Sequence, residues 1–259
     1  MSDNTGAFQA EMPPLAALHL AIFSRAPVPG ETKTRLIPAL GAKGACDFHS
    51  ACLNRLIAEA RAWRDGWKHL DLPAPGLHLF ITPPGSQVKF RMAGVDWPGD
   101  FSVHNQQGEN LGSRMANAME KVRETVRGQQ PGIPPEQVGV MVVGSDLPLM
   151  GARHWEAALG QLQRAPMVLG PTPDGGYYLI GMRKAIPEVF RIDGWGGETV
   201  LERTLAVAQG LGISVGQIDS LPDVDSGEDI SRVLAHPLAG ELQASAPMAL
   251  LRRLSSESR

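Results

Sequence analysis

A short basic segment, residues 25–35, is the first place where residue types and spacing could do chemistry. It carries three cations against one acid, together with a glycine and two threonines. Glycine lets backbone N–H groups approach a phosphate, while Arg and Lys supply opposite charge. The segment matches neither the Walker loop nor the dinucleotide-binding glycine pattern. We predict a phosphate-binding loop, with a solvated basic turn as the alternative. The residues concerned are Arg25, Gly30, Lys33, Thr34 and Arg35.

On this interpretation the basic side chains serve a ligand and not the fold. The Lys33→Ala substitution should then weaken nucleotide binding with little change in thermal stability.

The acid Asp146 directly follows the most apolar segment of the chain, residues 138–143. If that segment is a strand of a parallel sheet, the carboxylate emerges at the edge where ligands bind. A carboxylate there can hold Mg²⁺ or Mn²⁺ against a diphosphate, because these ions favour oxygen ligands. The alternative is an Asp that only forms the next turn.

Two further acids occupy similar places. Asp174 precedes two glycines in a connection between strand-like segments, where a tight turn is the alternative role. Asp225 follows Asp223 just upstream of a helix that Ser226 and Asp229 should cap.

The ligand-side loops of an open α/β sheet converge on one crevice, so these acids should lie close together. Carboxylates that converge repel one another unless a cation or proton intervenes. We therefore predict Asp146, Asp174 and Asp225 as catalytic residues. Asp146 and Asp225 are the expected ligands of a divalent metal cofactor, Mg²⁺ or Mn²⁺.

The composition of the 259-residue chain is that of an ordinary globular protein, with 43% hydrophobic and 20% charged residues and a formal net charge of −3. That balance does not indicate a nucleic-acid or anionic-membrane surface. No apolar run reaches the length of a membrane helix, no secretion signal is evident, and Cys46 and Cys52 match no zinc or disulfide pattern. A cytoplasmic location is expected, and the oligomeric state is left open.

Strand-like and helix-like segments alternate along the chain. Apolar runs predict strands at 18–23, 77–82, 101–105, 138–143, 167–169 and 177–180. Apolar spacings of three and four predict helices at 45–63, 111–126, 152–162 and 198–209. This order predicts an α/β fold with an open, mainly parallel sheet and helices on both faces. We expect a flexible leader at 1–16, one domain at 17–236, and a tail or frayed helix at 237–259.

These segments together resemble a family of bacterial proteins with the GT-A glycosyltransferase fold, which is Rossmann-like. Its members are described as nucleotide-diphospho-sugar transferases, and one branch is assigned to arsenosugar biosynthesis. The resemblance spans about residues 18–235, and each motif alone is weak. The motifs are residues 25–30, 33–36, Gln107-Gly108, Leu111-Gly112, Arg114-Met115, 144–148, Gly170-Pro171, 174–181, Trp195, 223–225 and Glu228-Asp229.

The resemblance implies a transferase, and more distantly suggests the guanylyltransferases of molybdenum-cofactor and phospholactate metabolism. The expected reaction is metal-dependent glycosyl transfer from a nucleotide-sugar to a small acceptor. The alternatives are nucleotidyl transfer from a nucleoside triphosphate to a phosphorylated acceptor, and nucleotide binding without catalysis. The resemblance adds Gln107 and Arg114 to the nucleotide and phosphate contacts. It also implies an acceptor loop containing Gly175, Gly176, Tyr177 and Trp195.

The chain departs from the family pattern at two places. Asn110 stands where the family commonly has Asp, so a role that depends on charge is in question there. Gly196 and Gly197 follow Trp195 where the family tends to have Ser-Thr, so acceptor contacts in that loop should differ.

Overall fold

The computed structural model describes residues 12–257, and within them one sheet of seven strands has the order β3-β2-β1-β4-β6-β5-β7. The strands are β1 (Ala17–Arg25), β2 (Gly76–Thr82), β3 (Ser102–Asn105), β4 (Val138–Gly144), β5 (Met167–Pro171), β6 (Tyr177–Met182) and β7 (Val215–Gln217). The pairings β1–β2, β1–β4, β2–β3 and β5–β7 are parallel, and β6 runs antiparallel to both β4 and β5. The predicted open, mainly parallel sheet is therefore confirmed.

Side-chain alternation along the strands creates two apolar faces. On β1, Leu18, Leu20 and Ile22 belong to one core cluster, while Ala21 and Phe23 belong to the other. Successive residues of a strand point to opposite faces, so a strand that is apolar throughout must be covered on both.

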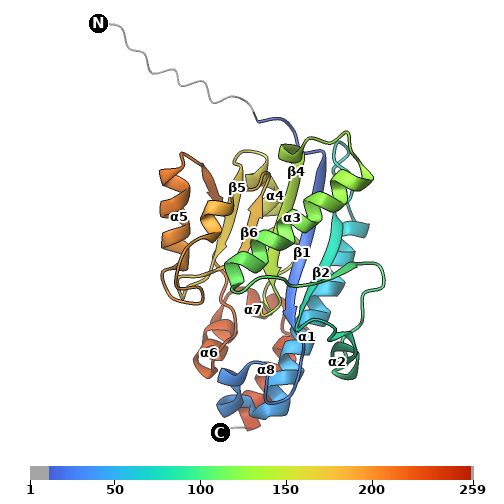
Figure 1. Ribbon diagram of the computed structural model, residues 1–259. Helices are drawn as coiled ribbons and strands as arrows, with labels where there is room; N and C mark the ends of the chain where they lie inside the picture. The colour runs from blue at the N-terminus through green and yellow to red at the C-terminus, as the bar shows by residue number, and fades with distance from the viewer. Residues whose placement is uncertain (1–11, 258–259) are drawn as a thin grey trace, which may run out of the picture.

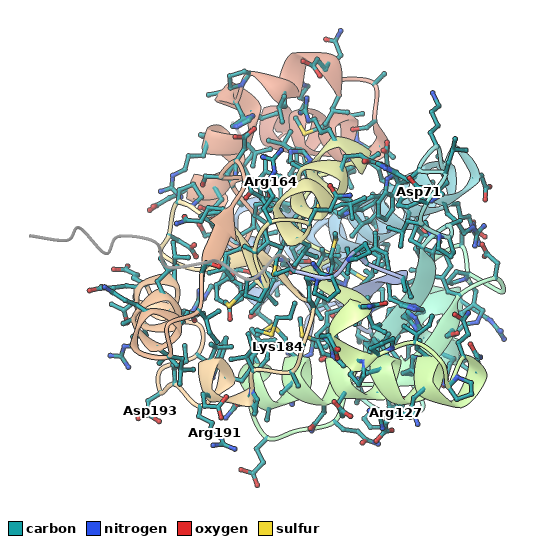
Figure 2. All side chains as sticks on the ribbon, turned by 90° about the horizontal axis from the view of Figure 1, so that it is seen from above. Asp71, Arg127, Arg164, Lys184, Arg191 and Asp193 are labelled. Atoms are coloured by element: carbon teal, nitrogen blue, oxygen red, sulfur yellow. The ribbon has the colours of Figure 1, made fainter. Side chains whose placement is uncertain are left out.

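Helices cover both faces, as Figure 1 shows from the front and Figure 2 from above. Helices α1, α4, α6 and α8 contribute to the first cluster, and α3 and α5 to the second. The helices are α1 (Ile37–Asp65), α2 (Gln87–Met92), α3 (Leu111–Gln129), α4 (Ala152–Leu162), α5 (Val200–Gly210), α6 (Gly227–Ala235), α7 (Leu238–Glu241) and α8 (Ala246–Glu257). Short 3₁₀ turns lie at Thr34–Leu36, Pro135–Gln137 and Pro187–Phe190.

The described residues near both chain ends pack against the rest of the chain. Leu15, placed by the sequence in a flexible leader, is buried, and the Ala16 N–H donates to the Gln137 carbonyl. Residues 1–11 of that leader lie outside the described residues. The expected tail contains α8, which packs against α1 and fully buries Met248 and Leu251. Apolar spacing in so short a terminal segment does not reveal which surface it will cover.

Three histidines form a line across the first three strands, on the face that α3 covers. His19 Nδ1 lies 3.0 Å from His78 Nε2, and His78 Nδ1 lies 3.3 Å from His104 Nε2. Burial, helped by the charge of Arg123, lowers the pKa of His19 to about 4. Burial, helped by His19 and His104, lowers the pKa of His78 to about 3. Each contact needs one protonated and one bare nitrogen, which neutral rings supply.

This line should make the free energy of unfolding depend on pH. The unfolded chain protonates these rings below their ordinary pKa of 6.5, whereas the folded chain resists protonation down to about 4. The unfolded state binds more protons in that window, so stability should fall as the pH falls from 6.5 to 4. We expect a loss of about 2 kcal/mol or more between pH 7 and pH 5, measured by urea unfolding.

The His78→Gln variant should show a shallower pH dependence, and His236→Gln, on a partly exposed ring, is the control. An unchanged slope in the His78 variant would show that the line is not responsible. The buried ring of His154, whose pKa burial lowers to about 4, contributes in the same direction, and with His19 it keeps part of the slope in the His78 variant.

Candidate functional site

The basic segment after β1 is a folded loop held by a threonine. The Thr32 hydroxyl accepts from the Val28 N–H at 3.0 Å and donates to the Ala26 carbonyl at 2.7 Å. Gly30 has a φ of 85°, and Lys33 is the one described residue other than glycine with a positive φ, 54°. A left-handed lysine is costly and persists where surrounding contacts hold it. Those contacts involve its side chain.

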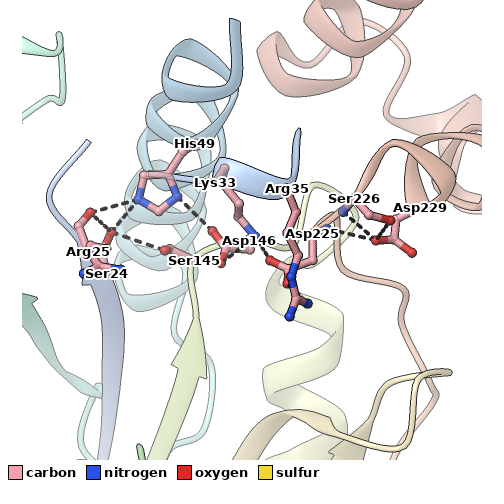
Figure 3. A network of polar contacts seen from close by, with 10 residues as sticks. All are labelled: Ser24, Arg25, Lys33, Arg35, His49, Ser145, Asp146, Asp225, Ser226 and Asp229. Carbon is pink, nitrogen blue, oxygen red and sulfur yellow. Dashed lines mark hydrogen bonds and ion pairs between the residues drawn. The ribbon is translucent and has the colours of Figure 1, made fainter. Parts of the chain in front are cut away.

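The Lys33 ammonium lies between two carboxylates (Figure 3). Its Nζ is 2.9 Å from Asp146 Oδ2 and 2.9 Å from Asp225 Oδ1, and the Lys33 side chain is only 6% exposed. Arg35 reaches Asp225 Oδ2 at 3.3 Å from the solvent side. The two carboxylates therefore face one point at the carboxyl edge of the sheet. The Asp225 backbone N–H is held in turn by Asp229, which also accepts from Ser226, as predicted for a helix cap.

His49, on α1, holds the opposite side of Asp146 (Figure 3). Its Nδ1 lies 2.8 Å from Asp146 Oδ1, and its Nε2 lies 2.9 Å from the Arg25 carbonyl oxygen. Both of its ring nitrogens are therefore engaged by neighbouring oxygens. His49 thereby links the end of β1 to the residue that follows β4.

The electrostatics favour charged forms of the central pair. Burial alone would raise the pKa of Asp146, but the Lys33 ammonium and the hydrogen bond from His49 hold it well below its usual range. Burial opposes the charge of Lys33, and the Asp146 and Asp225 carboxylates nevertheless raise its pKa. Asp223 behaves differently: burial, assisted by the carboxylates of Asp174, Asp225 and Asp146, raises its pKa to about 6 despite the nearby Lys33.

A first cavity of about 400 Å³ opens beside this network. Its lining includes the first-strand loop, His49 and both paired acids. Arg25 also lines it, and the described chain gives its exposed guanidinium no carboxylate partner. An anion that enters this cavity meets Arg25, which has no carboxylate partner, and Arg35, whose side chain is 76% exposed.

A second cavity of about 320 Å³ continues from the first. The two cavities share Phe23, Arg35, Leu111, Gly144, Asp146 and Asp225. Its other walls come from the β5–β6 connection, the start of β6 and residues 195–200. A β-carbon on Gly112 would lie 2.3 Å from the Trp195 indole, so only glycine permits this close approach. The indole also meets the Tyr177 ring edge-on, at 6.3 Å between centroids.

The predicted site residues are only partly brought together. Arg25, Lys33 and Thr34 line the first cavity; Asp174, Gly176, Tyr177 and Trp195 line the second; Arg35, Asp146 and Asp225 line both. Asp146 and Asp225 meet at Lys33, and Asp174 shares only the second cavity with them. Asp174 also keeps its turn role, because its Oδ1 accepts from the Thr172 hydroxyl and the Gly176 N–H.

Four other positions have local structural roles. Gln107 lines a separate hollow with His104, and Arg114 donates to the Gly108 carbonyl, so neither reaches the two cavities. Gly175 is required by its close approach to the backbone of Glu198, 1.8 Å from a would-be β-carbon. Asn110 caps α3 by accepting from the Ser113 N–H, a role that Asn fills as well as Asp.

Sequence reasoning missed His49 and Gln106. The seven scattered histidines formed no recognisable pair, and His49 lies one helix away from the acid that it contacts. Gln106, and not the predicted Gln107, lines the first cavity. Its side-chain amide donates to the Ser24 and Phe80 carbonyls. The only available signal for Gln106 was its place directly after an expected strand.

Because His49 fixes the orientation of Asp146, replacing it should weaken cation and nucleotide binding. We expect His49→Gln to lower the affinity for Mn²⁺ with a nucleotide by about 10- to 100-fold, as for residues that orient a ligand. The measurement is calorimetric titration. Ser50→Ala, at the adjacent buried position outside the cavities, is the control. Equal losses in both variants would indicate damage to α1 and not a loss of orientation.

The carboxylate oxygens of Asp146 and Asp225 suit a hard divalent ion, but these two side chains alone do not complete a metal site. Two carboxylates converge on a single positive charge, and Mg²⁺ is commonly held by one or two carboxylates together with substrate phosphates. Among residues 12–257 no group of three or more His, Cys, Asp or Glu side chains is arranged to hold a metal. A metal at this site thus depends on phosphate oxygens and on withdrawal of the Lys33 ammonium.

Comparison with solved structures shows that the chain shares its fold with transferases that act on nucleotide substrates. The chain is similar to a crystal structure described as a "putative nucleotide-diphospho-sugar transferase" from Desulfovibrio desulfuricans G20, at 26% identity and a TM-score of 0.73, covering 94% of this chain and 99% of that one. The fold is also shared with the 4-diphosphocytidyl-2C-methyl-D-erythritol synthase of Anaerococcus prevotii DSM 20548, at 8% identity and a TM-score of 0.50, covering 85% and 97%.

The family match found by sequence comparison covers a smaller part of the chain. Residues 69–197, just under half of the chain, match the family described as "Uncharacterized protein conserved in bacteria (DUF2064)". No curated protein matches the chain. None of the helices in the described part of the chain has the length and apolar character needed to cross a membrane.

Proposed function

We propose that this protein is a transferase of the nucleotide-diphospho-sugar type that moves a glycosyl group from a nucleotide-sugar to a small acceptor. The observation that carries the proposal is one crevice with two halves. The first-strand loop offers cations to a diphosphate, and the adjoining second cavity offers a walled space for a small molecule. The likeness to the Desulfovibrio protein supports the same class. Membership of the arsenosugar branch stays a prediction.

In the proposed reaction an acceptor hydroxyl attacks the anomeric carbon of the donor sugar. A new carbon–oxygen bond forms, and the bond from the anomeric carbon to the diphosphate oxygen breaks. The nucleoside diphosphate leaves with the electron pair, and the hydroxyl proton passes to a carboxylate of the second cavity. Arg25 and Arg35 stabilise the charge that grows on the leaving group, which is commonly the largest contribution to such catalysis.

A divalent cation, when bound, would neutralise additional diphosphate charge. Asp146 and Asp225 are the residues that would hold it, with His49 orienting Asp146. Lys33 provides the positive charge between these carboxylates until the cation and the diphosphate enter. We also place the protein in the cytoplasm, where buried free thiols such as Cys46 and Cys52 stay reduced.

The test is product analysis with Mn²⁺ or Mg²⁺ present. The protein is incubated with a panel of nucleotide-sugars and, separately, nucleoside triphosphates, each with candidate acceptors. Release of a nucleoside diphosphate from a nucleotide-sugar supports glycosyl transfer. Release of pyrophosphate from a triphosphate would establish nucleotidyl transfer instead. Tight nucleotide binding with neither product would establish a non-catalytic binding protein.

A further inference from the structure

The charge of the second cavity is strongly one-sided. Four carboxyl groups line it, against the single guanidinium of Arg35 among its described lining residues. Arg35 is already paired with Asp225, and Asp146 has its own cationic partner. The remaining two, Asp174 and Asp223, have no cationic partner in the described part of the chain.

These two carboxyl groups keep unused hydrogen-bonding capacity. Asp223 makes no side-chain hydrogen bond within residues 12–254, although it is only partly exposed. Asp174 uses Oδ1 for its own turn, and its Oδ2 makes no hydrogen bond within the described residues. An ionised carboxylate can only accept hydrogen bonds, so the ligand groups that suit it are donors such as hydroxyls.

Apolar and aromatic side chains line much of the rest of this cavity. They are Met115, Ile180, Tyr177 and Trp195. The Trp195 indole N–H is buried and has no hydrogen-bond partner among the described residues. The indole packs closely against Gly112 of α3, which fixes the ring in the cavity lining. A ligand that suits this lining carries hydroxyl groups for the carboxylates and presents a carbon face to the aromatic rings.

We propose that the second cavity binds the acceptor and selects an uncharged, polyhydroxylated molecule of the sugar or polyol class. This inference rests on the proposed function and narrows it. A phosphate or carboxylate on the acceptor would enter among unpaired carboxylates and be repelled. A phosphorylated acceptor, which nucleotidyl transfer requires, is therefore disfavoured. A volume of about 320 Å³ suits a molecule of monosaccharide size.

The experiment compares matched neutral and anionic probes. Saturation-transfer NMR is run on the full chain with Mg²⁺ and a saturating nucleoside diphosphate, so that the first cavity is filled. The probes are glucose, mannose and glycerol, each beside its phosphate monoester. We expect at least one neutral probe to bind and to bind at least tenfold more tightly than its ester. Equal or tighter binding of the esters, or no binding of any neutral probe, overturns the proposal.

Two variants locate the effect. The double variant Asp174→Asn with Asp223→Asn should reduce the preference for the neutral probe to less than threefold. Trp195→Leu should weaken binding of the neutral probe at least fivefold while leaving nucleotide affinity unchanged. Asp71→Asn, at the periphery of the molecule in Figure 2, is the control and should preserve the preference. An undiminished preference in the double variant also overturns the proposal.

Failure here is distinguishable from failure of the proposed function. Nucleotide binding and release of nucleoside diphosphate are measured on the same protein without these probes. If the nucleotide binds and is turned over while esters bind best in the second cavity, the acceptor class is wrong and glycosyl transfer stands. If no nucleotide binds, the proposed function itself fails.

Discussion

Replacing Asp146 by asparagine is expected to lower the rate of nucleoside diphosphate release by about 100-fold or more, because it removes one of the two carboxylates common to both cavities. Asparagine keeps an oxygen that can accept from His49 and forms turns as readily as Asp, so the fold should persist. The same variant should lose most of its Mn²⁺ affinity. Steady-state kinetics and metal titration provide the two measurements.

Thermal unfolding distinguishes a loss of function from a loss of structure in this variant. Asp71→Asn, an exposed acid on the loop before β2, should retain full activity. If Asp146→Asn stays active with an unchanged metal requirement, Asp146 is a turn residue and the metal assignment is wrong.

Replacing Lys33 by methionine is expected to destabilise the protein in metal-free buffer by about 2 kcal/mol, less than the 3–5 kcal/mol typical of a fully buried pair. The expected loss is smaller because the side chains of Asp146 and Asp225 are 34% and 49% exposed, so water screens their charges. Removing the ammonium leaves Asp146 and Asp225 facing each other without a charge between them. This differs from the expectation drawn from the sequence alone, in which Lys33 served only phosphates.

Mn²⁺ distinguishes the origin of that loss. If Asp146 and Asp225 form a metal site, millimolar Mn²⁺ should restore much of the lost stability in Lys33→Met and have little effect on the parent protein. The readout is the urea midpoint with and without Mn²⁺. Lys184→Met, an exposed lysine visible in Figure 2, is the control. A Lys33 variant as stable as the parent protein would show that the ion pairs contribute nothing to the fold.

The fold was predictable because its signals are local. The apolar run at 138–143 and the apolar stripe at 111–126 lie within the observed β4 and α3. The antiparallel direction of β6 was not assigned, since it depends on how the short turn through Asp174 closes. The short β7 (Val215–Gln217) and α2 carry too few apolar residues for a periodic pattern, so they were not predicted.

The site was less predictable because its partners are distant in the chain. The acids and the basic loop could be placed at one edge from strand order alone. The sequence could not show that Lys33 pairs with Asp146 and Asp225, which follow it by 113 and 192 positions. Nor could it show that His49, on a helix, holds Asp146. Those contacts depend on side-chain reach between elements, which periodicity does not encode.

The antiparallel strand β6 gives the two halves of the crevice separate origins in the chain. Because β6 starts at the edge where the parallel strands end, one hairpin supplies both Asp174 and Tyr177 to the same wall. The loop with Trp195 completes that wall, whereas the cations come from the segment after β1. If the proposed function holds, substitutions or insertions in the hairpin and that loop should alter which acceptor is used and leave recognition of the donor intact. Acceptor preference could then diverge among descendants of the protein by drift in two short stretches, under constant selection on the donor half.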